Sequence, residues 1–176
     1  MSQVTLSDED FVDFVDVKED TAFAVAELFA FKYLKEKCRG KIIFSKGIFD
    51  FVVYGTVNEK SIYVEVKYNH LSLSPEQVLF LAERLGSTRF WIISNKKKHL
   101  NEFLGYDGKY RRVVKYKVID TFNTPIGKFY VLEVIDVETL FSLEDEKDYV
   151  ARVYSTRSRE MWKRRKSVSG GDRKLL

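Results

Sequence analysis

Two strand-like segments separated by a well-punctuated helix constrain the fold of this chain more than any other feature. The segments read SIYVEVKY at 61–68 and RFWIIS at 89–94. Between them, residues 74–86 begin with an N-cap serine and a proline and end with a glycine, which predicts a helix. A strand–helix–strand passage of this length requires a crossover connection. We therefore expect the two strands to be parallel neighbours in one sheet.

The segments before this passage predict further strands and a long helix. KIIFSK at 41–46 and GIFDFVVYG at 47–55 are strand-like, and TVNEK joins the second of them to the strand that follows as a hairpin. Residues 16–38 contain no Gly or Pro, and Asp16 and Glu19 stand at the spacing of a capping box, so this segment predicts a helix. The expected fold is α/β, with a mixed central sheet flanked by helices.

The C-terminal half predicts a hairpin and a basic helix. RRVVKYKVID and GKFYVLEVIDV are separated by TFNTPI, and residues 144–166 have acids in the first turn and a basic end, as the helix dipole favours. A chain of 176 residues fits one domain, which we expect over 1–166. Its parts would be a core at 16–95 and the C-terminal hairpin and helix at 110–166, and residues 167–176 read as a flexible basic tail.

Composition limits the kinds of site and partner that this chain can have. The formal charge is +4, and nine Lys or Arg fall in residues 152–176, a local charge of +7 that leaves −3 for the rest. This balance permits an anionic partner. Cys38 is the only cysteine, so disulfide frameworks and cysteine-rich zinc sites within one chain are excluded. Without a secretory signal or a membrane-length apolar run, a cytoplasmic protein with no membrane partner is expected.

The strand at 61–68 carries two charged residues where an apolar strand is expected. Because successive side chains alternate between the faces of a strand, Glu65 and Lys67 share one face. Asp50 lies between Phe49 and Phe51 in the predicted partner strand. Two buried carboxylates on neighbouring strands repel each other unless a cation lies between them. We therefore predict a Mg²⁺ site on Asp50 and Glu65, with Mn²⁺ as a substitute and Lys67 assisting the attacking water.

These residues and their order resemble the PD-(D/E)XK nuclease superfamily, particularly its Holliday-junction-resolvase-like and virus-type replication-repair branches. The similarity covers roughly residues 16–95 and rests on a helix, GIFD, a hairpin, EVK, the SPEQ helix and a strand. It implies a restriction-endonuclease-like core in αβββαβ order. The resemblance assigns the catalytic metal to Asp50 and Glu65 and the assistance of water to Lys67. The chain departs from the family at Phe49, where the family usually has proline.

The resemblance also implies supporting residues for this site. A helix-borne glutamate often completes the metal site, and Glu27 or Glu19 would be that residue here. In related nucleases a glutamine at the position of Gln77 lies close to the active site. Junction resolvases act as dimers, so a homodimer is expected, and the compact size and virus-type similarity suggest a viral or archaeal source.

Structural roles compete with each of these assignments. A solvent-facing strand carries Glu-x-Lys as a cross-strand salt pair, and Ser74 with Gln77 forms a capping box in its own right. Glu27 reads equally well as a helix-surface carboxylate, and Glu19 reads better as a cap.

Two basic clusters predict contacts with nucleic acid. One is Lys96, Lys97 and Lys98, and the other is Lys163, Arg164 and Arg165. Each suits binding to phosphates, with tyrosines or Trp162 available for stacking. The expected function is a metal-dependent DNA endonuclease acting on duplex, branched or junction DNA in replication, recombination or repair. The alternative is a non-catalytic nucleic-acid-binding module that retains the nuclease fold.

Overall fold

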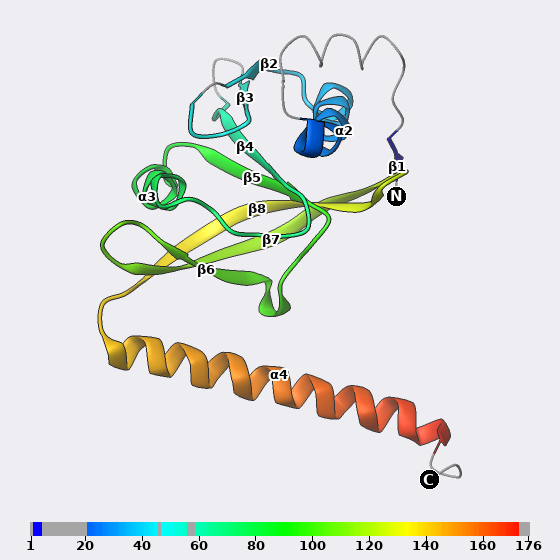
Figure 1. Cartoon of the computed structure of the whole chain (residues 1–176), viewed down its shortest axis with the longest axis vertical. Helices are drawn as coiled ribbons and strands as arrows, with labels where there is room; N and C mark the ends of the chain where they lie inside the picture. Colours follow the sequence, from blue (N-terminus) through cyan, green and yellow to red (C-terminus); the bar gives the residue numbers. More distant parts are fainter. Residues whose placement is uncertain (1, 5–20, 46, 56–58, 173–176) are drawn as a thin grey trace. The chain divides into compact units, whose positions relative to one another are not determined.

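The structure, a computed structural model, describes residues 2–4, 21–45, 47–55 and 59–172, without the side chains of residues 2, 21–23, 157, 158 and 160–172. The chain divides into two compact units, Met1–Thr139 and Leu140–Leu176. The first contains the sheet and the helices that cover it, and the second contains one long helix (Figure 1). No helix among the described residues is both long and apolar enough to cross a membrane.

The first unit is built on one mixed sheet (Figure 1). In the described chain its strand order is β1–β7–β8–β5–β4–β3–β2, and β6 pairs with β7. The parallel β4–β5 pair and the antiparallel β3–β4 hairpin confirm the two pairings predicted from the sequence. The strands are β1 (Ser2–Gln3), β2 (Lys41–Phe44), β3 (Phe51–Tyr54), β4 (Ile62–Lys67), β5 (Arg89–Ser94), β6 (Glu102–Tyr106), β7 (Arg111–Thr124) and β8 (Gly127–Leu140).

Two helices cover opposite faces of this sheet. Helix α2 (Thr21–Lys37) packs Phe29, Leu34 and other apolar residues into a core with Val64 of β4 and neighbouring strand residues. Helix α3 (Pro75–Arg84) packs Leu81 into a second core with Phe90 and Ile92 of β5. Alternation along β4 and β5 feeds both cores, which explains why these strands are apolar on both sides.

Helix α3 begins as its sequence predicts. The Ser74 Oγ accepts a hydrogen bond from the Gln77 backbone N–H at 3.2 Å, and the Ser74 N–H donates to Gln77 Oε1 at 3.0 Å. This is a complete capping box with proline at the first helical position. The cap predicted at Asp16 and Glu19 for the preceding helix lies outside the described residues.

The strand predicted at 47–55 begins later than expected. Gly47–Asp50 form bends, and β3 starts at Phe51, so Asp50 precedes the strand instead of lying within it. The Asp50 carbonyl still accepts the Ser45 N–H at 3.0 Å, and the Gly47 N–H donates to Ser45 Oγ at 3.0 Å. Short polar side chains offer the backbone local hydrogen bonds that compete with the ladder, which shortens the strand.

The C-terminal half differs from the prediction in its boundaries. The hairpin strand β7 extends into the predicted connection, and β8 continues three residues beyond the predicted end at 137. The 3₁₀ helix η1 (His99–Asn101) and β6 precede them without a clear periodic signal. Helix α4 (Leu143–Asp172) continues six residues beyond the predicted end at 166, so the described part of the predicted tail is helical. Extending an existing helix is easier than starting one, and no proline stops it before residue 172.

Candidate active site

Asp50 is fixed to β4 by a hydrogen bond that replaces the end of the sheet ladder. The β3–β4 register reaches Phe51 opposite Val64, where β3 begins. Two residues further along β4, the Val66 N–H donates to Asp50 Oδ2 at 2.8 Å. The carboxylate thus satisfies an amide that a longer strand would have paired. This bond holds Asp50 beside the carboxyl end of β4, where Glu65 and Lys67 lie.

Glu65 is a buried carboxylate surrounded by polar groups. Only 6% of the residue is exposed, and its Oε2 accepts a hydrogen bond from Gln77 Nε2. The Lys67 Nζ lies 3.4 Å from the same oxygen, which confirms that the two side chains share a face of β4. Burial, and then the neighbouring Asp50 carboxylate, raise the pKa of Glu65 well above its ordinary value, against the opposing effects of Gln77 and Lys67.

The side-chain amide of Gln77 has a structural role and a role at the site at once. Its Oε1 accepts the Ser74 N–H within the capping box, so Nε2 must point away from the helix terminus. Nε2 then donates to the Ile48 carbonyl at 2.7 Å and to Glu65. The capping role and the supporting role predicted for Gln77 are therefore compatible. Its amide links the start of α3, the bend before β3 and the buried carboxylate.

The two carboxylates offer the oxygens that a hard divalent cation prefers. Donors from the described residues engage Asp50 Oδ2 and Glu65 Oε2, and the two carboxyl groups also interact with each other. The fold therefore brings two acidic groups together at one place. This arrangement fits Mg²⁺, which binds one or two protein carboxylates and keeps several waters.

Within the part of the chain that the structure describes, a third acidic, histidine or cysteine side chain does not join this pair. Among the described residues, no group of three or more His, Cys, Asp or Glu side chains is placed to hold a metal ion. Glu27 is buried, at 9% exposure, on α2, which packs on the Val64 face of β4, whereas Glu65 alternates onto the other face. The structure thus does not bring Glu27 to the Asp50–Glu65 pair. Glu19 lies outside the described residues.

The loops after β4 and β5 are fastened together beside the site. The Asn69 N–H donates to Asn95 Oδ1 at 2.7 Å, and Asn95 Nδ2 donates to Asn69 Oδ1 at 2.9 Å. Ser94, opposite Lys67 in the parallel register, accepts the Lys96 N–H at 3.0 Å. The carboxyl ends of parallel strands meet at one edge of a sheet, so the first basic cluster begins next to the site.

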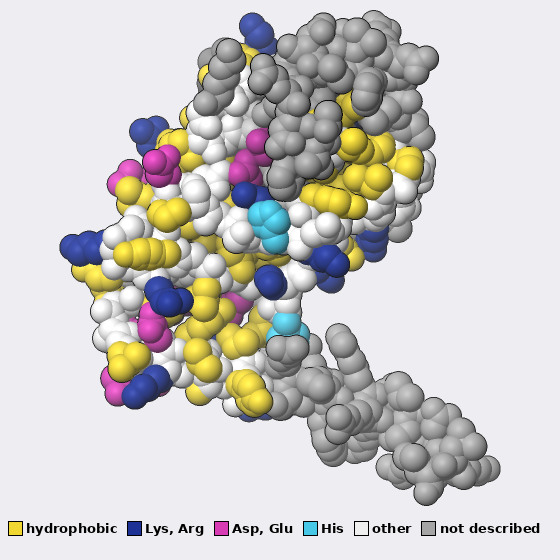
Figure 2. Space-filling view, in the orientation of Figure 1, with side chains coloured by type: hydrophobic (Ala, Val, Ile, Leu, Met, Phe, Trp, Pro, Cys, Tyr) yellow, Lys and Arg dark blue, Asp and Glu magenta, His cyan; other side chains and the backbone are white. Residues whose placement is uncertain are grey.

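Of the two basic clusters predicted to contact phosphates, the structure describes the side chains of one. Lys96, Lys97 and Lys98 are exposed immediately after β5. On the face seen in Figure 2, basic side chains are interspersed with acidic and hydrophobic ones and form no continuous band. Lys163, Arg164 and Arg165 lie on α4, but their side chains are outside the described residues.

Sequence reasoning missed two residues next to the first basic cluster, Tyr130 and Lys128. Tyr130 of β8 lies opposite Ser94, and the Nζ atoms of Lys97 and Lys128 lie 5.4 and 5.2 Å from its ring centroid. Both missed residues belong to the predicted hairpin strand, but the sequence does not reveal that β8 enters the sheet beside β5. Nothing in the segment GKFYVLEVIDV indicates that its partner in the sheet is β5.

Comparison with known proteins adds no assignment to this geometry. No protein-family model, curated protein or solved structure matches the chain.

Proposed function

We propose that this protein is a metal-dependent nuclease that hydrolyses phosphodiester bonds in DNA, with a restriction-endonuclease-like core formed by α2, β2, β3, β4, α3 and β5. The observation that carries the proposal is the convergence of Asp50, Glu65 and Lys67 at one end of β4, two carboxylates and one ammonium held by the fold. Burying one acidic group beside another is costly, and Gln77 and Lys67 offset only part of that cost, so a site kept in this form favours a functional reason.

Each side chain has a definable role in such a reaction. Asp50 and Glu65 would hold Mg²⁺, which when bound supplies Lewis-acid stabilisation of charge on the phosphate. Lys67 would orient the attacking water or stabilise the negative charge that develops on the phosphoryl oxygens. Gln77 would keep Glu65 oriented through its amide, and the basic loop at 96–98 would bind neighbouring phosphates.

Cleavage assays on labelled linear, branched and single-stranded DNA test this proposal. With Mg²⁺ or Mn²⁺ the protein should cut at least one substrate, and with EDTA it should cut none. Asp50→Asn and Lys67→Met should each reduce the cleavage rate by about 10²-fold or more, in line with the loss of one group that stabilises transition-state charge. An asparagine at 50 retains an oxygen for the Val66 N–H, so this variant is expected to fold. Exposed Glu83 on α3 supplies the control Glu83→Gln.

Two outcomes would redirect the proposal. DNA binding that is sensitive to salt, without cleavage under any metal condition, would leave the alternative of a non-catalytic binding module. Equal cleavage by wild type and Asp50→Asn would show that the activity resides elsewhere.

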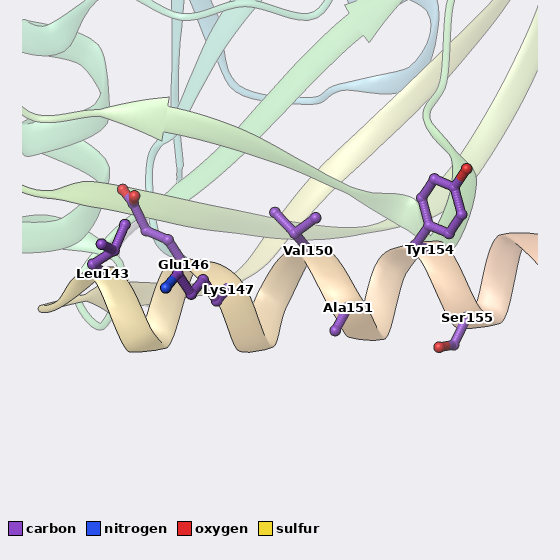
Figure 3. A pocket seen from close by; sticks show the side chains of 7 residues that line it. All are labelled: Leu143, Glu146, Lys147, Val150, Ala151, Tyr154 and Ser155. Carbon is purple, nitrogen blue, oxygen red and sulfur yellow. The ribbon is translucent and has the colours of Figure 1, made fainter.

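We also propose that the nuclease is a homodimer in which α4 pairs with α4 of a second copy. Leu143, Val150 and Tyr154 are 66%, 57% and 73% exposed and project to the same side of the helix (Figure 3). They line a shallow hollow with Glu146, Lys147, Ala151 and Ser155. The helix begins with acidic residues and has a basic sequence toward its other end, so an antiparallel pair would be complementary in charge. Sedimentation equilibrium of wild type and Val150→Asp tests this, and a wild-type monomer would refute it.

A further inference from the structure

A row of residues crosses three neighbouring strands beside the candidate active site. The register pairs Lys67 of β4 with Ser94 of β5, and Ser94 with Tyr130 of β8. Along β5 and β8 the residues flanking Ser94 and Tyr130 face the α2-side core, so both residues share the face of Lys67. Two interstrand spacings separate Lys67 from Tyr130, about 10 Å between backbones. A nucleotide next to one bound at Lys67 can reach that far.

Tyr130 has the chemical surroundings of a nucleotide subsite. The ring is half-buried against the α3-side core, which fixes its orientation. Two ammonium groups, from Lys97 and Lys128, converge on this one ring. Among the described residues neither lysine is paired with a carboxylate, so both charges remain available for phosphate. The hydrogen-bonded asparagine pair at 69 and 95 restrains the loop from which Lys97 projects.

We propose that Tyr130, Lys97 and Lys128 form a subsite for an unpaired nucleotide adjacent to the cleaved phosphate. The base would stack on the Tyr130 ring in place of the two ammonium groups, which would move from the ring to the phosphates of that nucleotide. Aromatic stacking and basic side chains together are used to bind single strands without sequence preference. A base inside a duplex already has both faces covered by its neighbours and cannot stack in this way. The inference rests on the proposed nuclease function and narrows its substrate to DNA with unpaired nucleotides, as in single strands and at branches.

Equilibrium binding in EDTA tests the subsite without cleavage. Fluorescence anisotropy would measure the Kd of wild type and Tyr130→Leu for a labelled single strand and for the duplex of the same sequence. The Kd for the single strand should rise about 5- to 100-fold in Tyr130→Leu, the range observed for loss of one stacked base, while the Kd for duplex changes less than about twofold. Tyr130→Phe keeps the ring and should bind as wild type does. Tyr54, exposed at the far end of β3, supplies the control Tyr54→Leu.

A second variant keeps the test decisive if Tyr130→Leu folds poorly. Lys97 and Lys128 are exposed, so Lys97→Ala/Lys128→Ala should fold normally. It should weaken single-strand binding and lower the slope of log K against log salt by up to about 1.4, since each single-strand phosphate bound contributes about 0.7. An unchanged slope, or equal losses of affinity for single strand and duplex in the ring variant, would overturn the subsite.

The outcomes separate this inference from the nuclease proposal. Selective loss of single-strand binding in a protein that never cleaves would support the subsite and refute the nuclease. Mg²⁺-dependent cleavage together with unchanged DNA binding in both variants would support the nuclease and refute the subsite.

Discussion

Among single residues, Gln77 illustrates how a structural cap can support a reactive group. Its Oε1 is committed to the Ser74 N–H, so the amide cannot rotate without losing a hydrogen bond. Its Nε2 therefore remains directed at Glu65 and the Ile48 carbonyl. A buried carboxylate without such a donor is strongly unfavourable. Gln77 thus stabilises the Asp50–Glu65 pair most when no metal ion is bound to it.

Replacing this amide with a carboxylate should destabilise the protein. Gln77→Glu removes the donor to Glu65 and adds a like charge, so we expect the free energy of unfolding to fall by about 1–3 kcal/mol. Urea unfolding at constant m-value measures the change. Glu76→Gln, at an exposed position of the same helix, should have little effect. Wild-type stability in Gln77→Glu would show that the amide does not support Glu65.

Asp107 is a second buried carboxylate, and its surroundings have the opposite effect. It lies in the turn between β6 and β7 and is 8% exposed. Its Oδ1 accepts the N–H groups of Lys109 and Tyr110 at 2.7 and 2.6 Å, and Arg112 Nε donates to Oδ2 at 2.7 Å. Burial alone would raise the pKa of Asp107, but the amides of Tyr110 and Lys109 and the Arg112 guanidinium outweigh it and lower the pKa.

This lowered pKa predicts a particular dependence of stability on pH. The ionised form is favoured in the folded state, so its contribution is present above the ordinary aspartate pKa of about 4 and is lost as pH falls through the lowered value. Asp107→Asn should therefore lose about 1–3 kcal/mol of unfolding free energy at pH 7, a difference that narrows in acid. Denaturant titrations from pH 7 to pH 3 check this. Asp136→Asn, at an exposed position where Oδ1 accepts the N–H of the next residue, is the control. A difference in unfolding free energy between wild type and Asp107→Asn that did not change with pH would contradict the lowered pKa of Asp107.

Among the helices and strands, the sequence predicted best where local signals and tertiary packing agree. Helix α3 has its cap, proline and apolar stripe in register, and β4 and β5 follow from its crossover. The predicted start of β3 was wrong because Asp50 uses its side chain, and not a ladder position, to pair with Val66. The place of β8 beside β5 depends on long-range packing that no local pattern encodes. Strand alternation made the pairing of Glu65 with Lys67 predictable, whereas Asp50 is held beside them by a side-chain hydrogen bond that the sequence does not indicate.

The cap of α3 should be a measurable part of its stability. Ser74→Ala removes the acceptor for the Gln77 backbone N–H, and such a change lowers stability by about 1 kcal/mol. Thermal unfolding followed by circular dichroism would detect it. Ser87→Ala removes a hydroxyl that donates to the Arg84 carbonyl beyond the end of the same helix. A smaller change, within about 0.5 kcal/mol, is expected there. Equal losses in the two variants would mean that the capping box contributes nothing specific.

Across the chain, apolar packing and positive charge are divided between the two units. The two apolar cores draw their buried residues from positions 4–134, all within the first unit. The second unit contributes a long helix and a net charge of +4, because the acidic residues at 144–148 offset part of the +7 carried by residues 152–176. A nuclease built in this way would hold its reactive groups in the first unit and take much of its electrostatic affinity for DNA from the second.

A chain that ends at Ser142 tests this division. Because both cores remain intact, its unfolding midpoint should match that of the full chain, and Mg²⁺-dependent cleavage should persist at high protein concentration. Its affinity for DNA should fall, with a shallower dependence on salt, since every duplex phosphate that the protein neutralises contributes about 0.9 to the slope. Replacing Lys163, Arg164 and Arg165 with glutamine in the full chain separates charge from the helix itself. The slope for that variant should decrease by up to about 2.7, and an unchanged slope would show that these three residues of α4 do not bind DNA.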